Sequence, residues 1–335
     1  MRIAILFAFA FAFPSFTQPL PGTRPLTPPA DPVAKMVEGI RAYLLRVTEA
    51  SLHGRKPDRE RLRYLIGAVD PRIPFAAPER DGSVTSPAKI AETAAIEVFA
   101  VRWPVLDGVT AEGLYFQPKG SVKARTVVLP DAGQQPEESA IAWRLASSGC
   151  EVLVPVLIDR NDTWSGNPKF RMTSQPHREY IYRMAFPVGR HIIGYEVQKA
   201  LAAVDWFAKQ SKRPIGIWGH GEGGLLALHA AAIDQRIDAA AVGGYFESRQ
   251  KMRREPIYRN IWGQLKDFGD AEIASLIAPR KLVVETSRGP ETRGPSTADA
   301  KRTGGAPGVL LSPTSEAAQL EAERARNLGA NIEVV

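Results

Sequence analysis

One glycine-rich segment carries the residues of this sequence that are best placed for chemistry. The apolar run Ile215–Trp218 leads into Gly219-His220-Gly221-Glu222, and a helix-like stretch begins at Gly223. A histidine and a carboxylate at a tight turn are groups that can move protons, and glycines allow a strand and a helix to approach closely. Two motifs with different chemistry fit this spacing.

The first motif is the nucleophile elbow, G-x-S-x-G, which holds a reactive side chain on a strained turn above a sheet. Gly219 and Gly223 take the flanking positions, while Gly221 stands at the centre in place of Ser, Cys or Asp. Glycine has no side chain, so a covalent acyl intermediate cannot form at this position. Glycine also relieves the backbone strain that such a turn otherwise stores.

The second motif is the dinucleotide fingerprint, G-x-G-x-x-G, satisfied by Gly219, Gly221 and Gly224, with Glu247 as a candidate ribose ligand. Two observations oppose it. Glu222 places a carboxylate where a pyrophosphate would bind at the helix N-terminus. The motif also follows several strands, whereas the fingerprint belongs to the first β–α unit. The sequence therefore predicts no bound cofactor, with dinucleotide binding kept as an alternative.

Acid–base candidates lie on both sides of the vacant position. His220 and Glu222 flank Gly221 and could activate a water, although both also suit an ordinary turn. Glu285 and Glu291 come at the end of the predicted strand Lys281–Thr286 and after it, and are the candidate acids. A solvated loop carboxylate is the alternative interpretation for each of these two glutamates.

A second loop could supply substrate contacts. Asp131, Gly133 and Gln134 follow the predicted strand Arg125–Leu129. Backbone N–H groups in this loop and at Glu222 could bind an oxyanion or a carboxylate, although the charge of Asp131 opposes this. We predict these three loop residues as substrate-binding candidates.

Proton transfer lacks an obvious histidine. The last histidine is His229, in a predicted helix, and the chain stops at Val335 inside a strand that begins at Asn331. Two interpretations follow. Catalysis is impaired, or the chain is a fragment that ends before a catalytic histidine.

Metal chemistry is not predicted. Asp159, Asn161 and Asp162 offer three oxygens within four residues, but Asx-turn hydrogen bonding explains them more simply. Cys150 is the single cysteine, so neither an intrachain disulfide nor a zinc site of paired cysteines is expected.

The elements around the motif alternate between strands and helices. A predicted hairpin, Ile96–Val105 and Val109–Gln117, turns at Asp107-Gly108. Further strands are predicted at 125–129, 151–157, 214–218, 237–246, 281–286 and 331–335, and helices at 137–147, 194–209, 223–232, 257–268 and 314–328. This order predicts an α/β fold with a mostly parallel sheet and helices on both faces.

With this element order, residues 96–335 resemble the dienelactone hydrolase and acetyl xylan esterase-like branch of the α/β-hydrolases. The resemblance rests on Gly194-Tyr195-Glu196, on the elbow segment and on residues 277–280, Ile-Ala-Pro-Arg. It implies acyl or acetyl ester hydrolysis, with a small-molecule or carbohydrate ester as substrate. Because Gly221 replaces the nucleophile, two functions remain: an impaired carboxylic-ester hydrolase, or a non-catalytic relative that binds a ligand or an unidentified protein partner.

The N-terminus has the pattern of an export signal. Arg2 precedes the short apolar run Ile3–Phe13, which predicts a signal peptide over 1–17 and a secreted or periplasmic protein without a membrane anchor after cleavage. A Pro-rich linker over 18–31 and a helical extension over 32–95 are predicted before the hydrolase-like domain at 96–335. The net charge of +7 comes from scattered residues, so no nucleic-acid partner is expected.

Overall fold

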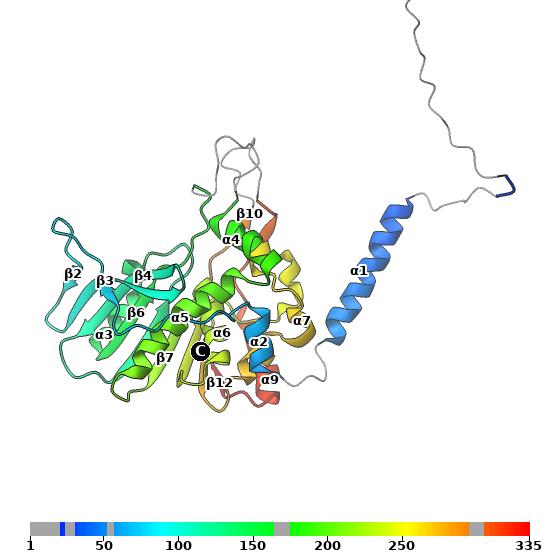
Figure 1. Ribbon diagram of the computed structural model, residues 1–335. Helices are drawn as coiled ribbons and strands as arrows, with labels where there is room; N and C mark the ends of the chain where they lie inside the picture. Colours follow the sequence, from blue (N-terminus) through cyan, green and yellow to red (C-terminus); the bar gives the residue numbers. More distant parts are fainter. Residues whose placement is uncertain (1–20, 24–30, 52–56, 164–174, 295–304) are drawn as a thin grey trace, which may run out of the picture. The chain divides into compact units, whose positions relative to one another are not determined.

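The computed structural model describes residues 21–23, 31–51, 57–163, 175–294 and 305–335 (Figure 1). It divides into two units, Met1–Val47 and Thr48–Val335. The predicted signal peptide and most of the predicted linker lie outside the described residues. No described helix combines the length and apolar character needed to cross a membrane.

Ten strands of the described chain form one sheet, in the order β1-β3-β4-β6-β5-β7-β8-β9-β12, with β2 paired beside β3. Along the sheet, the neighbouring strands β6, β5, β7, β8, β9 and β12 pair in parallel. Every pair that involves β1, β2, β3 or β4 is antiparallel. The predicted mostly parallel α/β sheet is therefore confirmed. The strands are β1 (Glu79–Arg80), β2 (Lys89–Glu92), β3 (Ile96–Leu106), β4 (Val109–Pro118), β5 (Ala124–Leu129), β6 (Cys150–Pro155), β7 (Ile215–His220), β8 (Ala239–Gly243), β9 (Lys281–Glu285) and β12 (Ile332–Val334).

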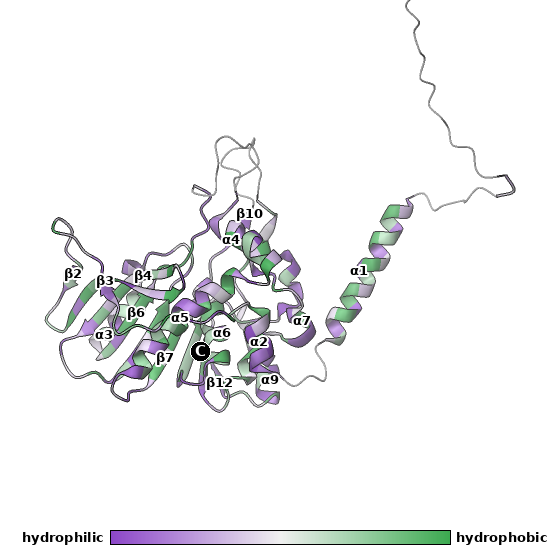
Figure 2. Cartoon of the chain, viewed as in Figure 1, coloured by the Kyte–Doolittle hydropathy of each residue, from purple (hydrophilic) through white to green (hydrophobic). Residues whose placement is uncertain are grey.

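Helices cover both faces of this sheet. One buried cluster joins the sheet to α5, α6, α8 and α9, and a second joins the opposite face to α3. The strands are predominantly hydrophobic in Figure 2, as expected for parallel strands buried between helical layers. The helices are α1 (Pro32–Ala50), α2 (Arg59–Leu65), α3 (Ala140–Ser147), α4 (His177–Ala185), α5 (Ile192–Lys209), α6 (Glu222–Ile233), α7 (Gln264–Asp267), α8 (Asp270–Ser275) and α9 (Ser315–Asn327), with short 3₁₀ turns η1 (Pro136–Glu138), η2 (Phe186–Val188), η3 (Arg249–Arg254) and η4 (Ile257–Arg259).

Local sequence explains the turn between β3 and β4 and the start of α2. The β3–β4 hairpin turns at Gly108, whose φ of +70° is a conformation that glycine adopts without steric cost. The Asp58 side chain accepts a hydrogen bond from the Glu60 N–H and caps α2, which satisfies a backbone donor that the helix leaves free. Both features follow from residues visible in the sequence.

The predicted helical extension over 32–95 contains more than helices. β1 and β2 lie within it and pair with β3, and α2 belongs to the same unit as the sheet. Both strands are short and mostly exposed, so the alternation that normally indicates a strand is missing. A second sheet pairs β10 (Thr292–Gly294) with β11 (Gly308–Leu310).

The helix α1 is amphipathic and carries no buried residue. Figure 2 shows hydrophobic and hydrophilic residues on its surface. Val33, Met36, Ile40, Leu44 and Val47 recur at helical spacing and are 47 to 67 % exposed. This apolar stripe is therefore exposed to solvent along most of the helix.

Candidate active-site region around Gly221

The segment that carries the glycine motif forms a sharp turn between a strand and a helix. β7 ends at His220 and α6 begins at Glu222, with Gly221 between them at φ 58° and ψ −118°. Side chains of L-residues rarely adopt this conformation, and it matches the strained strand-to-helix turn of a nucleophile elbow. A Cβ atom at Gly223 would collide with the backbone oxygen of Leu129, so the glycine permits the close approach of α6 to β5.

The space beside Gly221 is filled by other parts of the chain. A Cβ atom on Gly221 would collide with Oδ1 of Asp131 and would lie 2.8 Å from Cδ of Pro290. Asp131 follows β5, and Pro290 follows β9. The turn therefore has no room for even the first atom of a side chain without movement of these neighbours.

Asp131 also occupies the backbone donor at the start of α6. Its Oδ1 accepts a hydrogen bond of 3.0 Å from the Glu222 N–H, at the helix N-terminus where an anion is favoured. The N–H of Gly133 donates to Asp131 Oδ2 at 3.3 Å, and the N–H of Gln134 donates to the Asp131 carbonyl at 2.9 Å. The backbone N–H groups of Gly133, Gln134 and Glu222, which were candidates to bind an oxyanion, are thus bonded within the chain.

A buried network of ion pairs surrounds this contact. Arg160 holds Asp131 through two hydrogen bonds of 2.5 and 2.8 Å. Glu222 is fully buried and pairs with Arg259 at 2.7 Å, Arg178 at 3.4 Å and Arg160 at 3.5 Å. These five residues are named here the α6 charge network. Because removing one partner leaves a buried charge uncompensated, such a network is costly to disturb.

The network keeps its two carboxylates ionised. Burial alone would raise the pKa of Asp131, but the hydrogen bonds from Arg160 outweigh it and bring the value to about 2. Burial likewise opposes ionisation of Glu222, yet Arg259, Arg178 and Arg160 lower its pKa below the usual value. Neither carboxylate therefore holds a proton that it could donate as a general acid near neutral pH.

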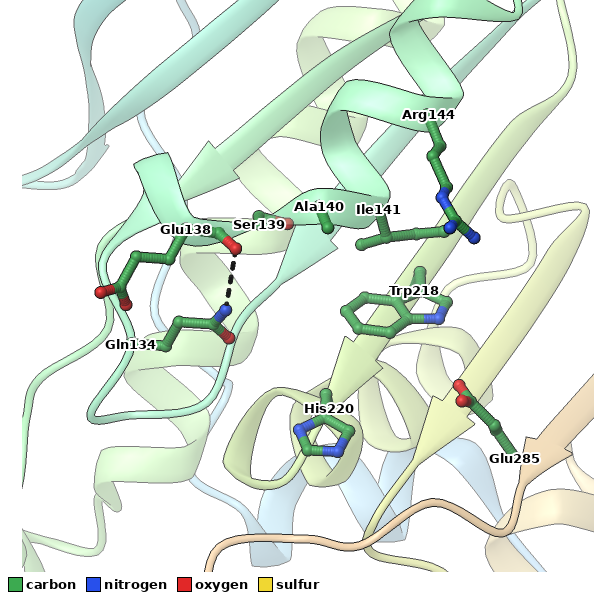
Figure 3. Close-up of a pocket in the computed structure, with 9 residues that line it drawn as sticks. All are labelled: Gln134, Glu138, Ser139, Ala140, Ile141, Arg144, Trp218, His220 and Glu285. Atoms are coloured by element: carbon green, nitrogen blue, oxygen red, sulfur yellow. Dashed lines mark hydrogen bonds between the residues drawn. The ribbon is translucent and has the colours of Figure 1, made fainter.

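His220 and Glu285 face a different part of the molecule. Together with Trp218 and Arg144 they line a cavity of about 450 Å³ between α3 and the carboxyl ends of β7 and β9 (Figure 3). His220 Nε2 lies 2.9 Å from the Arg288 carbonyl. Since a carbonyl only accepts, Nε2 carries the hydrogen and Nδ1 of a neutral ring is left as an acceptor.

The other candidate residues lie apart from the turn. Glu291 is exposed in the loop after β9. His229 is buried in α6 and its Nδ1 bonds the Leu225 carbonyl at 2.8 Å. Asp159 accepts a hydrogen bond from the Asn161 N–H, which is the Asx turn predicted in place of a metal site. Within the described ranges, no group of three His, Cys, Asp or Glu side chains is arranged to hold a metal ion.

Sequence reasoning missed the two most buried arginines of the network. Arg178 lies on α4, which was not predicted, and Arg259 ends η4 within a stretch predicted as helix. Their partners are 44 and 37 residues away in the chain, so no local pattern could pair them. A polar residue that is buried because it is paired is indistinguishable in sequence from an exposed one.

Comparisons with known proteins agree with this architecture. Residues 111–258 match the model of the dienelactone hydrolase family. No curated protein has a significantly similar sequence.

Solved structures of esterases match the fold over most of the chain. A protein described as an acetyl xylan esterase, from Bacteroides fragilis, is 12% identical with a TM-score of 0.59, and the match covers 89% of this chain and 81% of that chain. Methylesterase BT1017 is 16% identical with a TM-score of 0.53, covering 90% of this chain and 62% of the other. The chain therefore has the α/β-hydrolase fold, and its residues 111–258 match the dienelactone hydrolase family.

Proposed function

We propose that this protein is a non-hydrolytic relative of carboxylic-ester hydrolases, and that it binds a carbohydrate ligand without cleaving an ester through an acyl-enzyme. The observation that carries the proposal is the contact between Asp131 Oδ1 and the Glu222 N–H, directly beside Gly221. Gly221 corresponds, in this proposal, to the nucleophile position of the family.

Ester hydrolysis through an acyl-enzyme needs an attacking side chain and donors for the oxyanion. Gly221 offers no attacking atom. The N–H of Glu222, which follows the turn, is bonded to a carboxylate that would repel a developing oxyanion. The turn at Gly221 therefore lacks both the attacking atom and a free oxyanion donor. Together these two features support a loss of ester hydrolysis more strongly than the glycine alone.

The carbohydrate part of the proposal comes from the relatives. The acetyl xylan esterase with the same fold is named for an acetylated polysaccharide, and a pseudo-hydrolase can keep a binding surface after it loses its nucleophile. Because only the shared fold suggests this ligand class, carbohydrate binding is tested separately from hydrolysis.

The test of lost hydrolysis uses the purified full-length chain with p-nitrophenyl acetate and with a fluorophosphonate probe that labels activated serines. We expect turnover equal to that of serum albumin at the same concentration and no labelled protein. The variant Gly221→Ser combined with Asp131→Ala should behave in the same way, because the histidines of β7 and α6, His220 and His229, each bond a backbone carbonyl.

Two results would contradict the proposal directly. Saturable turnover that His220→Ala abolishes would assign a water-activating role to His220 and make the protein a hydrolase. A mass increase of the intact protein equal to one acyl group would contradict it as well.

A further inference from the structure

The cavity beside Trp218 is separate from the α6 charge network. Trp218 and His220 are two residues apart on β7, so their side chains project from the same face of the sheet. Their rings lie nearly parallel, at 11°, with centroids 6.3 Å apart. Together they make an aromatic floor at the carboxyl end of a parallel strand, where ligands bind in sheets of this type.

A glycine on the neighbouring strand leaves room for two polar groups at the edge of this floor. A Cβ atom on Gly243 would lie 3.1 Å from Cδ2 of His220 and 3.3 Å from Oε2 of Glu285. The histidine ring and the carboxylate therefore both lie close to Gly243 at the ends of β7 and β9. This end of the cavity is lined by acceptor groups, since His220 Nε2 is already engaged with Arg288.

Two charged groups of opposite sign flank the floor. Figure 3 shows Arg144 of α3 and Glu285 of β9 on either side of the Trp218 ring. Across the residues that the structure describes, neither the Arg144 guanidinium nor the Glu285 carboxylate makes a hydrogen bond or an ion pair. Both are exposed, and both are therefore free to bind a ligand.

The polar groups of the cavity include both acceptors and donors. Gln134 donates its amide N–H to the Glu138 carbonyl at 3.2 Å, which leaves its Oε1 as an acceptor. Glu285 accepts only, and His220 presents Nδ1, while Arg144 is the one guanidinium donor in the lining. A ligand that matches this set carries both O–H donors and acceptors.

We propose that this cavity, the Trp218 cleft, is a saccharide-binding site. A sugar ring has an apolar C–H face that packs on an indole, and hydroxyl groups that donate to Glu285, Gln134 and His220 and accept from Arg144. The volume of about 450 Å³ lies within the range of roughly 300–1,000 Å³ typical of small-molecule sites. The inference rests on the carbohydrate ligand of the proposed function and places that ligand in a cavity that Gly221 does not line.

The test is a titration of the full-length chain with xylotriose, followed by calorimetry and by tryptophan fluorescence. We expect saturable binding that Trp218→Ala weakens about tenfold or more. Glu285→Gln and Arg144→Met should each weaken binding roughly tenfold, because each removes a hydrogen bond to a charged group. These two exposed side chains can be changed without disturbing the core, so they report on the site even when Trp218→Ala fails to fold.

The matched control is Trp262→Ala, which removes a tryptophan that is 71 % exposed and outside the cleft. The affinity of this variant for xylotriose should equal that of the unchanged protein. The absence of saturable binding up to about 10 mM, far weaker than a typical specific site, would overturn the inference. Binding that survives both Glu285→Gln and Arg144→Met would overturn it too, while leaving a carbohydrate ligand elsewhere on the protein.

The two proposals fail in different experiments. Ester turnover by the unchanged protein contradicts the non-hydrolytic function and leaves the Trp218 cleft in place. Xylotriose binding that is insensitive to the cleft variants contradicts the location and leaves the absence of turnover in place.

Discussion

The carboxylate of Asp131 and the backbone N–H of Glu222 are joined by a hydrogen bond of 3.0 Å across 91 residues of sequence. The contact closes the N-terminus of α6, which would otherwise attract an external anion. Arg160 holds the same carboxylate with two further hydrogen bonds. A place suited to a substrate oxyanion or a pyrophosphate is thereby filled by the chain itself, which also disfavours the dinucleotide alternative.

We predict that Gly221→Ser destabilises the fold. The new Cβ atom would collide with Asp131 and adopt a φ that L-residues avoid. The matched control is Gly108→Ser, which has a positive φ of +70° but nothing within 4 Å. Urea unfolding should show Gly221→Ser to be less stable than the control by about 1–3 kcal/mol, the usual cost of overpacking. Equal stability of the two variants would mean that Asp131 and Pro290 give way freely.

Arg178→Met should be among the most damaging substitutions. Arg178 is completely buried and pairs with both Glu196 and Glu222. Its removal leaves two buried carboxylates short of a partner, a loss of about 3–5 kcal/mol in comparable cases. Thermal and urea unfolding measure the effect.

The control for Arg178→Met is Arg102→Met, which breaks an exposed ion pair with Glu79. Exposed pairs contribute little to stability, so this variant should unfold close to the unchanged protein. Similar losses for both variants would show that the α6 charge network has no special stabilising role.

Stability should fall as the pH drops from about 6.5 to about 4. Burial lowers the pKa of His191 and His229 to about 4, whereas histidines of the unfolded chain titrate near 6.5. In this window the unfolded chain binds protons that the native protein does not, so each histidine costs up to roughly 3 kcal/mol. Urea unfolding across this range should show that the free energy of unfolding of His229→Gln depends less steeply on pH than that of the unchanged protein. An unchanged slope in that variant would exclude His229 as a source.

Asp270 should act in the opposite direction. Burial raises its pKa to about 7 even though Arg249 lies 3.2 Å away. Its contribution to stability is complete below the unfolded value near 3.9 and is lost as the pH rises through 7. The stability of Asp270→Asn relative to the unchanged protein should therefore increase between pH 4 and pH 8. Glu316→Gln, which removes a carboxylate at an exposed position on α9, is the control and is measured over the same pH range.

The sequence predicts the sheet well because hydrophobic patterns are local. The hairpin turn at Asp107-Gly108 and the strand before Gly219 are confirmed nearly to the residue, since alternating or continuous apolar runs record burial directly. α4 was missed because its buried residues include Arg178 and Glu179. Their burial depends on partners far away in the chain, which a local pattern does not contain.

The candidate site could likewise be predicted only where local sequence determines it. Gly221 could be identified from its neighbours, because the flanking glycines answer a local steric need. The ion pair between Asp131 and Arg160 could not be predicted, because the two residues lie on separate loops that only the folded sheet brings together. His220 and Glu285 were predicted individually, and the structure places both in the Trp218 cleft.

The collision between a side chain at position 221 and Asp131 also restricts how this turn can change by mutation. While Asp131 remains paired with Arg160, a mutation that places a serine at the turn is disfavoured before it confers any benefit. The reverse order first removes Asp131 and leaves an arginine without its carboxylate in a buried setting. Each route begins with a less stable intermediate, so selection for stability alone would preserve the glycine.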